Sequence, residues 1–356
     1  MSYRQYENFY KNKRILITGH TGFIGSWLTK WLTMLDAQVC GYALDPPIQP
    51  NLYEVLNLTR KVSKDIRGDI RNTKLLRKTI IDFQPEIVFH LAAQPIVLES
   101  YDNPLETFDT NVIGTVNLLN ELRKVDSLKA IVVVTSDKSY RNNEWVYPYR
   151  ETDELGGRDP YSASKSCQDI VAKSFKESYF SDSGVALSSV RAGNVIGGGD
   201  WAKNRIVPDI VRGIISGQPV RIRNPNSVRP WQHVLEPVSG MLLLAQKMYG
   251  DPRFSGAWNF GPNNESDVTV REVVEKVIAF WGTGEYKIEK NFSKKEAKYL
   301  SLDISKAKRE LEWFPMYDID RALELTVKWY KTYYNDYKKI EGMTDKQIKS
   351  YLAGEL

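Results

Sequence analysis

The chain has few of the residues that form metal sites and disulfides. Its 356 residues include two cysteines, Cys40 and Cys167, and three histidines. The cysteines lie far apart in the sequence, so neither a zinc motif nor a disulfide framework is indicated. No run of about 18 uncharged apolar residues occurs, and residues 1–14 are polar and charged rather than a secretory signal. We therefore expect a cytoplasmic protein with no metal and no membrane contact.

Blocks of charge of one sign are absent as well. The 49 basic and 44 acidic residues leave a formal net charge of +5 and are scattered along the chain. This balance excludes the strongly basic surface of a typical nucleic-acid-binding protein, so we expect no nucleic-acid partner. A local group of arginines suits instead a small ligand that bears phosphate groups; its members are Arg205, Arg221, Arg223 and Arg229.

Strand-length apolar runs alternate with amphipathic helical patterns through the first half of the chain. The runs occupy residues 14–18, 38–44, 86–93, 129–136 and 184–195, and helical patterns occupy residues 25–37, 115–125 and 166–180. This alternation predicts an α/β fold with a Rossmann-like, doubly wound parallel sheet. The hydrophobic content of 42% is enough for a sizeable core, and the length favours two lobes.

From about residue 195 the pattern changes to shorter elements and to segments rich in glycine and proline. Helices are expected near residues 207–216, 235–249, 268–282 and 304–311, and a last helix, rich in Lys and Tyr, is expected to cover a surface at about 319–337. We assign residues 1–194 to the Rossmann-like lobe. Residues 195–356 are assigned mainly to a smaller, mixed α/β lobe, with residues from roughly 230 to 260 returning to the first lobe.

A glycine-rich turn follows the first predicted strand. Gly19, Gly22 and Gly25 have the spacing that permits a tight turn, a close backbone approach to a pyrophosphate, and close packing of helix on strand. Because the turn stands between a strand and an amphipathic helix, dinucleotide binding is favoured over a purely structural turn. The expected cofactor contacts of this turn are Gly19, His20, Thr21, Gly22, Phe23, Ile24 and Gly25.

Asp45 follows the second predicted strand, about 20 positions after the turn, where an acidic residue holds a ribose in dinucleotide-binding folds. It precedes two prolines, so a loop residue without that role is the alternative. No arginine follows this strand closely in the sequence, which favours NAD over its phosphorylated form.

Tyr161 and Lys165 lie four residues apart at the start of a predicted helix. Positions i and i+4 face the same side of a helix, so both side chains can point into one cleft. We expect the lysine to lower the pKa of the tyrosine and so make a base that removes a proton from a sugar hydroxyl as hydride leaves the same carbon. In a chain with 20 tyrosines such a spacing also arises by chance. The preceding turn and the strand that ends near Ser136 favour the catalytic interpretation.

Several longer strings resemble one family. The strings TGHTGFIG, HLAAQP, TSDKSY and YSASK are together similar to the extended short-chain dehydrogenase/reductase family. GYALDPP, DPYSASK, RAGNVIGGGDWA, RNPNSVRPWQHVLEP and WNFGPN resemble CDP-glucose 4,6-dehydratases along nearly the whole chain. The resemblance implies a homodimeric hydro-lyase of deoxysugar and O-antigen biosynthesis. Such an enzyme uses NAD catalytically: it oxidises C4 of the sugar of CDP-glucose, eliminates water across C5 and C6, and returns hydride to C6.

The resemblance also implies roles for individual residues. Ser136 would hydrogen-bond the C4 oxygen, and Asp137 would protonate the departing C6 hydroxyl. Lys138 stands where related dehydratases carry a glutamate base, and burial beside positive charge would favour the neutral amine that a C5 base needs. Further cofactor contacts are implied for Asp69, Ile70, Leu91, Ala92 and Ala93, and substrate contacts for Gln94, Asn194, Arg205, Arg221 and Arg229.

Two departures from the family pattern concern ligand binding. Ile24 stands where many CDP-glucose dehydratases have a lysine, which bears on how tightly NAD is held. Leu98 and Glu99 replace an Arg-Leu pair near the rim of the predicted site. At the residue level, Trp201 and Trp231 either line the nucleotide or fill the core. His90 and His233 are expected to be structural.

Other functions remain open. A nucleotide-sugar 4-epimerase, or a 4,6-dehydratase for another nucleotide hexose, shares the turn, the Tyr/Lys pair and the arginines. A simple reductase consumes NADPH, and a non-catalytic dinucleotide-binding regulator keeps only the fold. Asp137 and Lys138 are the discriminating residues, because an epimerase needs no acid at C6. The alternative for these two is an ion pair at a strand end.

Overall fold

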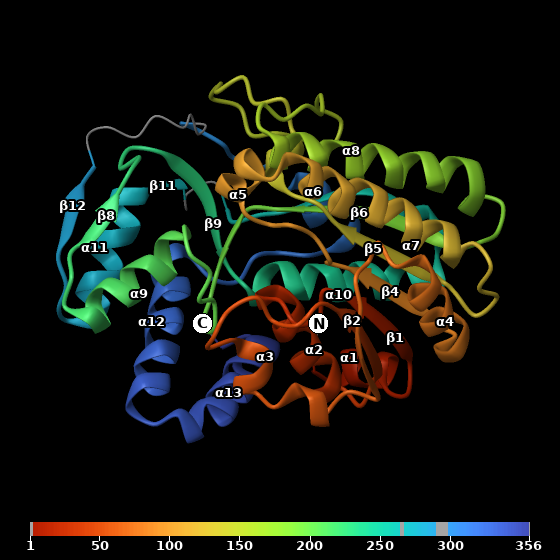
Figure 1. Ribbon diagram of the computed structural model, residues 1–356, viewed down its shortest axis with the longest axis horizontal. Helices are drawn as coiled ribbons and strands as arrows, with labels where there is room; N and C mark the ends of the chain where they lie inside the picture. The colour runs from red at the N-terminus through yellow and green to blue at the C-terminus, as the bar shows by residue number, and fades with distance from the viewer. Residues whose placement is uncertain (1–2, 264–266, 290–297, 356) are drawn as a thin grey trace.

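The protein is described by a computed structural model that places residues 3–263, 267–289 and 298–355. Its centre is a seven-stranded sheet in the order β10-β6-β5-β4-β1-β2-β3 (Figure 1). All neighbouring strands in this sheet are parallel, which confirms the predicted Rossmann-like sheet. The strands are β1 (Arg14–Thr18), β2 (Gln38–Ala43), β3 (Lys64–Arg67), β4 (Ile87–His90), β5 (Ala130–Val134), β6 (Ala186–Ala192) and β10 (Gly256–Phe260).

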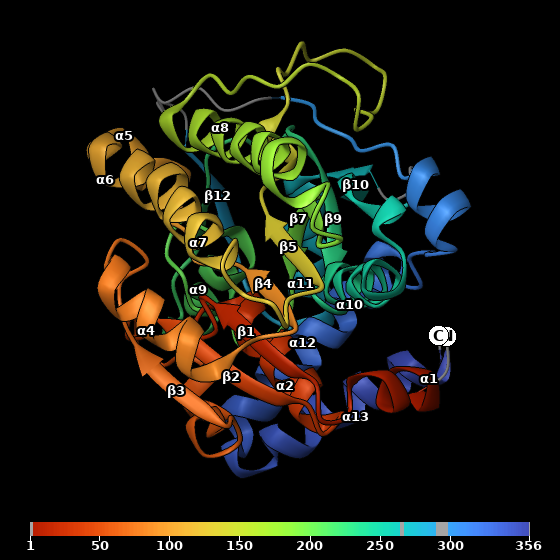
Figure 2. The same ribbon diagram turned by 90° about the vertical axis from the view of Figure 1, so that its right-hand side faces the viewer.

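Helices cover both faces of this sheet, and each face has its own core. Successive residues of β1 point to opposite faces, so Leu16 belongs to one buried cluster, and Ile15 and Ile17 to another. Figure 2 shows α4, α7 and α8 on one side of the sheet, and α2 and α10 on the other. These helices are α2 (Phe23–Met34), α4 (Thr73–Phe83), α7 (Gly114–Leu122), α8 (Pro160–Phe175) and α10 (Leu235–Gly250).

The remaining elements of the first 180 residues are short or lie at the edges. α1 (Tyr3–Tyr10) leads into β1, and α3 (Leu52–Val55) with the 3-10 turn η1 (Leu58–Arg60) connects β2 to β3. α5 (Val97–Asp102), α6 (Pro104–Phe108) and the π-helical η2 (Asp109–Ile113) precede α7. A 3-10 turn, η3 (Asp137–Ser139), follows β5, and the π-helical η4 (Lys176–Phe180) extends α8.

The second lobe is built from two small sheets and three helices at one end of the molecule (Figure 1). One sheet has the order β11-β9-β7, and the other pairs β12 with β8. The strands are β7 (Asn194–Ile196), β8 (Val220–Ile222), β9 (Val228–His233), β11 (Asp267–Thr269) and β12 (Tyr286–Ile288). The helices are α9 (Ile206–Ser216), α11 (Val270–Trp281) and α12 (Ile319–Asn335). Thr269 and Glu272 form a reciprocal capping box that starts α11.

The last 120 residues do not all belong to the second lobe. α10 packs against β5 and β6, and β10 pairs with β6 in the central sheet. Between them lies the 3-10 turn η5 (Pro252–Phe254). Near the C-terminus are the π-helical η7 (Ala307–Leu311), the 3-10 turn η8 (Tyr337–Lys339) and α13 (Ile340–Ala353).

The prediction that the helix near 319–337 merely covers a surface is wrong. α12 packs against α11, α13 and β9, and it buries Trp329 and Tyr330 completely. Aromatic rings spaced along one face outweigh the lysines on the other, so the helix forms part of the core of the second lobe.

The parallel strands place their carboxyl ends at one edge of the sheet. There the glycine turn follows β1, Leu91 follows β4, and Thr135 follows β5. The connections leave β1 in opposite directions, since β2 lies on one side of it and β4 on the other. Such a change in strand order opens a crevice outside the carboxyl ends, which is where open α/β sheets bind ligands.

Candidate active site

The glycine turn has the geometry of an anion cradle. Gly19 has a φ of +78°, and a Cβ there would stand 2.6 Å from the backbone nitrogen of Ala92 on the neighbouring strand connection. A Cβ on Gly25 would stand 2.1 Å from the carbonyl oxygen of Gly19. α2 begins directly after Gly22, and no side chain caps its N-terminal amides. The turn therefore brings bare backbone and a positive helix end to the crevice, as a pyrophosphate requires.

His20 is held inside the turn rather than at its surface. The ring is completely buried, its Nε2 lies 2.9 Å from Asp65 Oδ1, and it meets the edge of Tyr53. A Cβ on Gly41 would stand 2.2 Å from this ring, so β2 passes directly against it. Burial lowers the pKa of His20. These contacts make the imidazole a structural part of the turn, and the predicted cofactor contact of this residue is left to its backbone.

Asp45 lies just after β2, as the sequence predicts, and an arginine lies close to it. Its side chain is 85% exposed at the end of β2, and Arg67 Nε from β3 lies 3.5 Å from its carboxylate. Arg67 also contacts Asp65 at 3.1 Å. No arginine follows β2 closely in the sequence, but β3 brings Arg67 beside Asp45 in space. The preference for NAD over its phosphorylated form therefore stays a prediction.

The other predicted cofactor residues follow β3 and β4. The Arg71 guanidinium hydrogen-bonds the Asp69 carboxylate and lowers its pKa. Ile70 is buried against Gly114 at the start of α7. Leu91, Ala92 and Ala93 are partly buried at the carboxyl end of β4, beside the glycine turn.

Ser136 and Asp137 form a compact acid site directly after β5. Ser136 is the N-cap of η3: its Oγ accepts a hydrogen bond from the Lys138 amide and lies 3.0 Å from Asp137 Oδ1, to which it donates. Asp137 is 2% exposed, and its Oδ2 has no hydrogen-bond partner among the described residues. Burial raises the pKa of Asp137, and the charges of Lys138 and Arg229 only partly oppose this. A buried carboxyl of this kind holds its proton to higher pH than a free one and can act as an acid.

Tyr161 lies in the first turn of the helix that carries the predicted pair. The Asp159 carboxylate caps α8 by accepting from the Ser162 amide, and Pro160 stands at the first helical position, so Tyr161 falls in the first turn. The Tyr161 amide donates to Ser100 Oγ at 3.1 Å, which ties α8 to α5. The side chain is 8% exposed at the edge of the sheet where η3 lies.

The lowering of the Tyr161 pKa by Lys165 stays a prediction, because burial dominates the pKa of both groups. Burial raises the pKa of Tyr161 to about 12, while a hydrogen bond with Ser136 and the charge of Arg205 act to lower it. Lys165 is 3% exposed, donates to Val134 O at 3.2 Å and Gln168 Oε1 at 2.9 Å, and has its own pKa lowered to about 7 by burial. Desolvation dominates both groups, and the positive charge that favours the tyrosinate comes from the second lobe.

Two of the predicted substrate arginines lie beside the catalytic groups. Arg205 is partly buried, pairs with Asp200 at 2.9 Å, and is close enough to Tyr161 for its charge to act on the phenol. Arg229 on β9 is buried, and its charge acts on Asp137. The structure thus brings cationic groups of the second lobe to the acid and base of the first.

The remaining predicted substrate residues are less directly placed. Arg221 is exposed on β8, and Asn194 is partly buried at the start of β7. The amide nitrogen of Gln94 donates to Thr107 at 3.0 Å, and its oxygen accepts from the Ile96 amide. The Gln94 side chain is therefore engaged by Thr107 of α6 and by the Ile96 amide, and its substrate contact stays a prediction.

Trp201 and Trp231, whose roles the sequence leaves open, and the two histidines expected to be structural all belong to the core or its hydrogen-bond network. Trp201 meets the rings of α12, and Trp231 donates its indole N–H to Val268 O at 3.2 Å. His233 is completely buried, with its pKa lowered to about 3 by burial. His90 is buried within a hydrogen-bonded network behind the site.

Sequence reasoning missed a buried ion pair behind the catalytic turn. Asp169 on α8 accepts two hydrogen bonds from Arg191 of β6, both at 3.1 Å, and a third from Thr135 at 2.9 Å. Arg191 also donates to Tyr140 at 2.8 Å. Asp169 stands four residues after Lys165, on the same helix face, and that spacing was the available signal.

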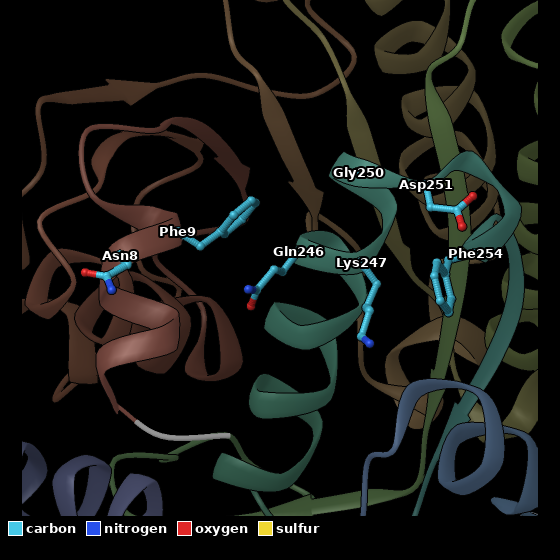
Figure 3. Close-up of a pocket in the computed structure, with 7 residues that line it drawn as sticks. All are labelled: Asn8, Phe9, Gln246, Lys247, Gly250, Asp251 and Phe254. Carbon is cyan, nitrogen blue, oxygen red and sulfur yellow. The ribbon is translucent and has the colours of Figure 1, made fainter.

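A groove elsewhere contains none of the predicted residues. It lies between α1 and the C-terminal end of α10, where Figure 3 shows the seven residues that line it: Asn8, Phe9, Gln246, Lys247, Gly250, Asp251 and Phe254. These residues precede β1 and β10, so the groove is at the amino-terminal edge of the sheet, opposite the glycine turn. Within the described ranges, no three His, Cys, Asp or Glu side chains are grouped to hold a metal ion. No described helix is both long and apolar enough to cross a membrane.

Comparisons with known proteins agree with this geometry. A family model described as GDP-mannose 4,6 dehydratase matches residues 16–326. The CDP-glucose 4,6-dehydratase of Salmonella typhimurium is 50% identical over 334 residues, which is 92% of this chain and 93% of that protein. The dTDP-glucose 4,6-dehydratase of Haemophilus influenzae is 27% identical, over 89% of this chain and 97% of that protein.

Solved structures share the fold. The dTDP-glucose 4,6-dehydratase of Bacillus anthracis in complex with NAD is 26% identical, has a TM-score of 0.76, and covers 92% of this chain and 99% of that one. The UDP-glucose 4-epimerase of Thermotoga maritima with UDP-glucose is 25% identical, has a TM-score of 0.78, and covers 89% and 98%. The chain therefore belongs to the nucleotide-sugar 4,6-dehydratases of the extended short-chain dehydrogenase/reductase family, hydro-lyases that work with a nicotinamide dinucleotide.

Proposed function

We propose that the protein converts CDP-glucose into CDP-4-dehydro-6-deoxyglucose and water, with NAD as its cofactor. The 50% identity to the Salmonella typhimurium enzyme supports CDP-glucose as the substrate. The observation that carries the reaction type is the buried Asp137 carboxyl with its raised pKa, one oxygen of which has no partner among the described residues. A dehydratase needs such an acid because a hydroxyl group leaves C6. A 4-epimerase breaks no bond there.

The residues of the turn fit a dinucleotide. No side chain could be added at Gly19 or Gly25 without meeting backbone within 3 Å, and no side chain caps the start of α2, so its backbone amides are left for an anion. Gly19 to Gly25 would hold the pyrophosphate, Asp45 a ribose, and Asp69, Ile70 and Leu91 to Ala93 the rest of the cofactor. When bound, NAD supplies a hydride acceptor for C4 and later a hydride donor for C6, so it is regenerated in each turnover.

Oxidation at C4 is assigned to Tyr161 and its neighbours. The phenolate of Tyr161 takes the proton of the C4 hydroxyl, and Ser136, which interacts with both Tyr161 and Asp137, binds the same oxygen. A phenol with a pKa of about 12 is a weak source of phenolate at neutral pH. Positive charge from Arg205 lowers this pKa, and Lys165 on the same helix face adds to the effect when a ligand draws its ammonium toward the phenol.

Elimination is assigned to Asp137 and Lys138. The C4 ketone makes the C5 proton acidic, Lys138 is the proposed base that takes that proton, and Asp137 gives its proton to the C6 oxygen, which leaves as water. Hydride then reaches C6 and Lys138 returns a proton to C5, so the product differs from the substrate by one water. Arg205 and Arg229 bind the diphosphate from the second lobe, where their charges also act on Tyr161 and Asp137.

Turnover in deuterated water tests this proposal. Purified protein with CDP-glucose and a catalytic amount of NAD is expected to give a product that has lost water and carries one deuterium at C5, read by mass spectrometry and NMR. An epimer without loss of water would identify an epimerase. If CDP-glucose stays unchanged while another nucleotide hexose is turned over, the assignment of CDP-glucose as the substrate is overturned and the reaction type is kept. Lys138→Met that still exchanges the C5 proton would remove Lys138 as the base.

The proposed assembly is a homodimer. The proposed location is the cytoplasm, and the proposed role is a step of deoxysugar synthesis. Exposed apolar side chains support the homodimer: Leu105 is 87% exposed, and Phe108, Ile113 and Ile170 are also exposed, on the mutually packed elements α6, η2 and α8; Figure 2 shows α6 next to α8. Light scattering of the wild type is expected to give twice the chain mass. The double variant Leu105→Lys with Ile170→Lys is expected to give the mass of one chain. A monomeric wild type would contradict the assignment.

A further inference from the structure

A buried hydrogen-bonded chain connects the glycine turn to Lys165. Thr18 at the end of β1 lies 2.7 Å from His90 Nδ1, and His90 Nε2 lies 2.9 Å from Thr115 Oγ1 on α7. Gln168 Nε2 donates to the same Thr115 oxygen at 2.8 Å, and Lys165 donates to Gln168 Oε1 at 2.9 Å. The first four of these residues have no exposed surface, and Lys165 is 3% exposed.

The direction of each hydrogen bond in this chain can be worked out. The single hydroxyl proton of Thr115 is committed to Asn111 O, which accepts it at 2.7 Å. Thr115 Oγ1 can therefore only accept from its other two neighbours, His90 Nε2 and Gln168. Only the NH₂ end of the Gln168 amide can donate to it, so the carbonyl end must face Lys165. The threonine thus decides which end of the glutamine meets the lysine.

The histidine fits the same scheme. Because Nε2 carries the proton given to Thr115, Nδ1 accepts from the hydroxyl of Thr18, whose oxygen in turn accepts from the Ala92 amide at 3.3 Å. This arrangement requires a neutral imidazole. Burial and the charge of Lys165 lower the pKa of His90 to about 3, which keeps it neutral. Every donor and acceptor in the chain then has one consistent role.

We propose that Gln168 is a positioning residue for Lys165, which it holds through its amide oxygen in the one orientation that Thr115 and His90 permit. The other acceptor of the ammonium, Val134 O, is backbone and cannot be altered independently. Asp169, the nearest carboxylate on the helix, is engaged by Arg191 and Thr135 instead. This inference rests on the proposed role of Lys165 in C4 oxidation, and it adds Gln168 to the residues on which that step depends.

Titratable and polar groups approach Lys165 from several elements. On its own helix it faces Asp169, which is paired with Arg191 of β6, and Tyr161 lies one turn away. β4 contributes the neutral His90, and α7 with η2 contributes the uncharged Thr115 and Asn111. η3, with Asp137 and Lys138, also packs on α8. Among the described side chains, the Gln168 amide oxygen is the acceptor of a hydrogen bond from the Lys165 ammonium.

The test measures the pKa of Lys165 directly in the wild type and in two variants, in the protein without ligands. Lysine labelled with ¹³C at Cε is titrated by NMR, and the Lys165 signal is assigned by its loss in Lys165→Met. Gln168→Met keeps the shape and removes the acceptor, and is expected to lower the pKa of Lys165 by about one unit, the effect of one charge-assisted hydrogen bond. Gln168→Glu keeps an acceptor and adds a negative charge, and is expected to raise it by about one unit.

A matched control separates positioning from packing. Gln347→Met removes another buried glutamine, which donates to Leu325 O from α13, and should leave the Lys165 titration unchanged. In the pH profile of turnover, the alkaline limb of Gln168→Met is expected about one unit lower than in the wild type, and that of Gln168→Glu higher. A Lys165 pKa equal in all three proteins, or moved in the same direction by both substitutions, overturns the proposal. If Gln168→Met fails to fold, Thr115→Val, which releases the amide, is expected to shift the titration in the same direction as the loss of the acceptor.

The NMR result does not depend on the substrate. If the wild type does not dehydrate CDP-glucose but Gln168→Met and Gln168→Glu move the Lys165 titration in opposite directions, the proposed function fails and the positioning role stands. If the wild type dehydrates CDP-glucose but the Lys165 titrations of wild type and both Gln168 variants coincide, the positioning role fails and the proposed function stands.

Discussion

Replacing Lys165 with methionine is expected to change how the stability of the protein depends on pH. Burial lowers the pKa of this lysine from 10.5 to about 7 in the folded chain. The unfolded chain therefore binds more protons than the folded one between these two pH values. Stability of the wild type rises with pH wherever the unfolded state holds more protons, so the destabilising effect of Lys165 is full below pH 7 and fades as pH rises toward 10.5.

The size of the effect follows from the shift. Each pH unit above the folded pKa contributes about 1.4 kcal/mol until the unfolded lysine also loses its proton, so the contribution between pH 7 and pH 9 is roughly 2 kcal/mol. Methionine removes this dependence. Methionine also removes the hydrogen bonds to Val134 O and Gln168. Their loss changes the free energy of unfolding by an amount that does not vary with pH in this range. The pH-dependent part thus isolates the buried charge.

Urea unfolding at pH 6, 7, 8 and 9, without cofactor or substrate, measures this difference. The stability of Lys165→Met relative to wild type is expected to be greatest at pH 6 and to fall by roughly 3 kcal/mol by pH 9. Lys74→Met, at an exposed position on α4, serves as the control and should follow the wild type at every pH. A difference between Lys165→Met and wild type that is constant across pH, or that grows more favourable with it, would falsify the reasoning.

Three further changes test other parts of the site. Asp137→Asn is expected to lower turnover about 10²- to 10⁴-fold while C4 oxidation, followed by absorbance of the reduced cofactor in a single turnover, persists; loss of both steps would contradict its role as the C6 acid. Gly25→Ala places a methyl group 2.1 Å from Gly19 O and is expected to lower stability by about 1 to 3 kcal/mol and to weaken NAD binding in calorimetry, whereas Gly342→Ala, at an open position on α13, should change neither. Asp169→Asn leaves Arg191 buried without its carboxylate and is expected to lower the free energy of unfolding by about 3 to 5 kcal/mol, with part of the loss recovered in Asp169→Leu with Arg191→Met; an unaltered single variant would show the pair to be dispensable.

The glycine turn and the start of α8 could be located from the sequence because their signals are local. A buried parallel strand reads as an unbroken apolar run, and β1 has the bounds that this run predicts. Gly19 needs a positive φ, and Asp159 followed by Pro160 is a strong start for a helix. The i and i+4 spacing of Tyr161 and Lys165 then follows from helix geometry alone.

β3 and α12 were misread for physical reasons. β3 has the sequence KDIR and stands at the edge of the sheet, where it is only partly buried and needs no apolar run. This strand was not predicted from the sequence, and so the approach of Arg67 to Asp45 was missed. The tyrosines of α12 were expected on the surface with the lysines, yet Trp329 and Tyr330 are buried, because α12 packs against several elements, α11, α13 and β9.

Chain-local information was sufficient for the dinucleotide turn, the catalytic helix and the family resemblance, since steric demands and helix periodicity act between neighbours in sequence. The protonation chemistry of the site was not accessible in this way. Burial sets the pKa values of Asp137, Tyr161 and Lys165, and the charges of Arg205 and Arg229 that act on them arrive from the second lobe. Desolvation and Coulomb interactions depend on distances in space, and only the packing of the two lobes defines those distances.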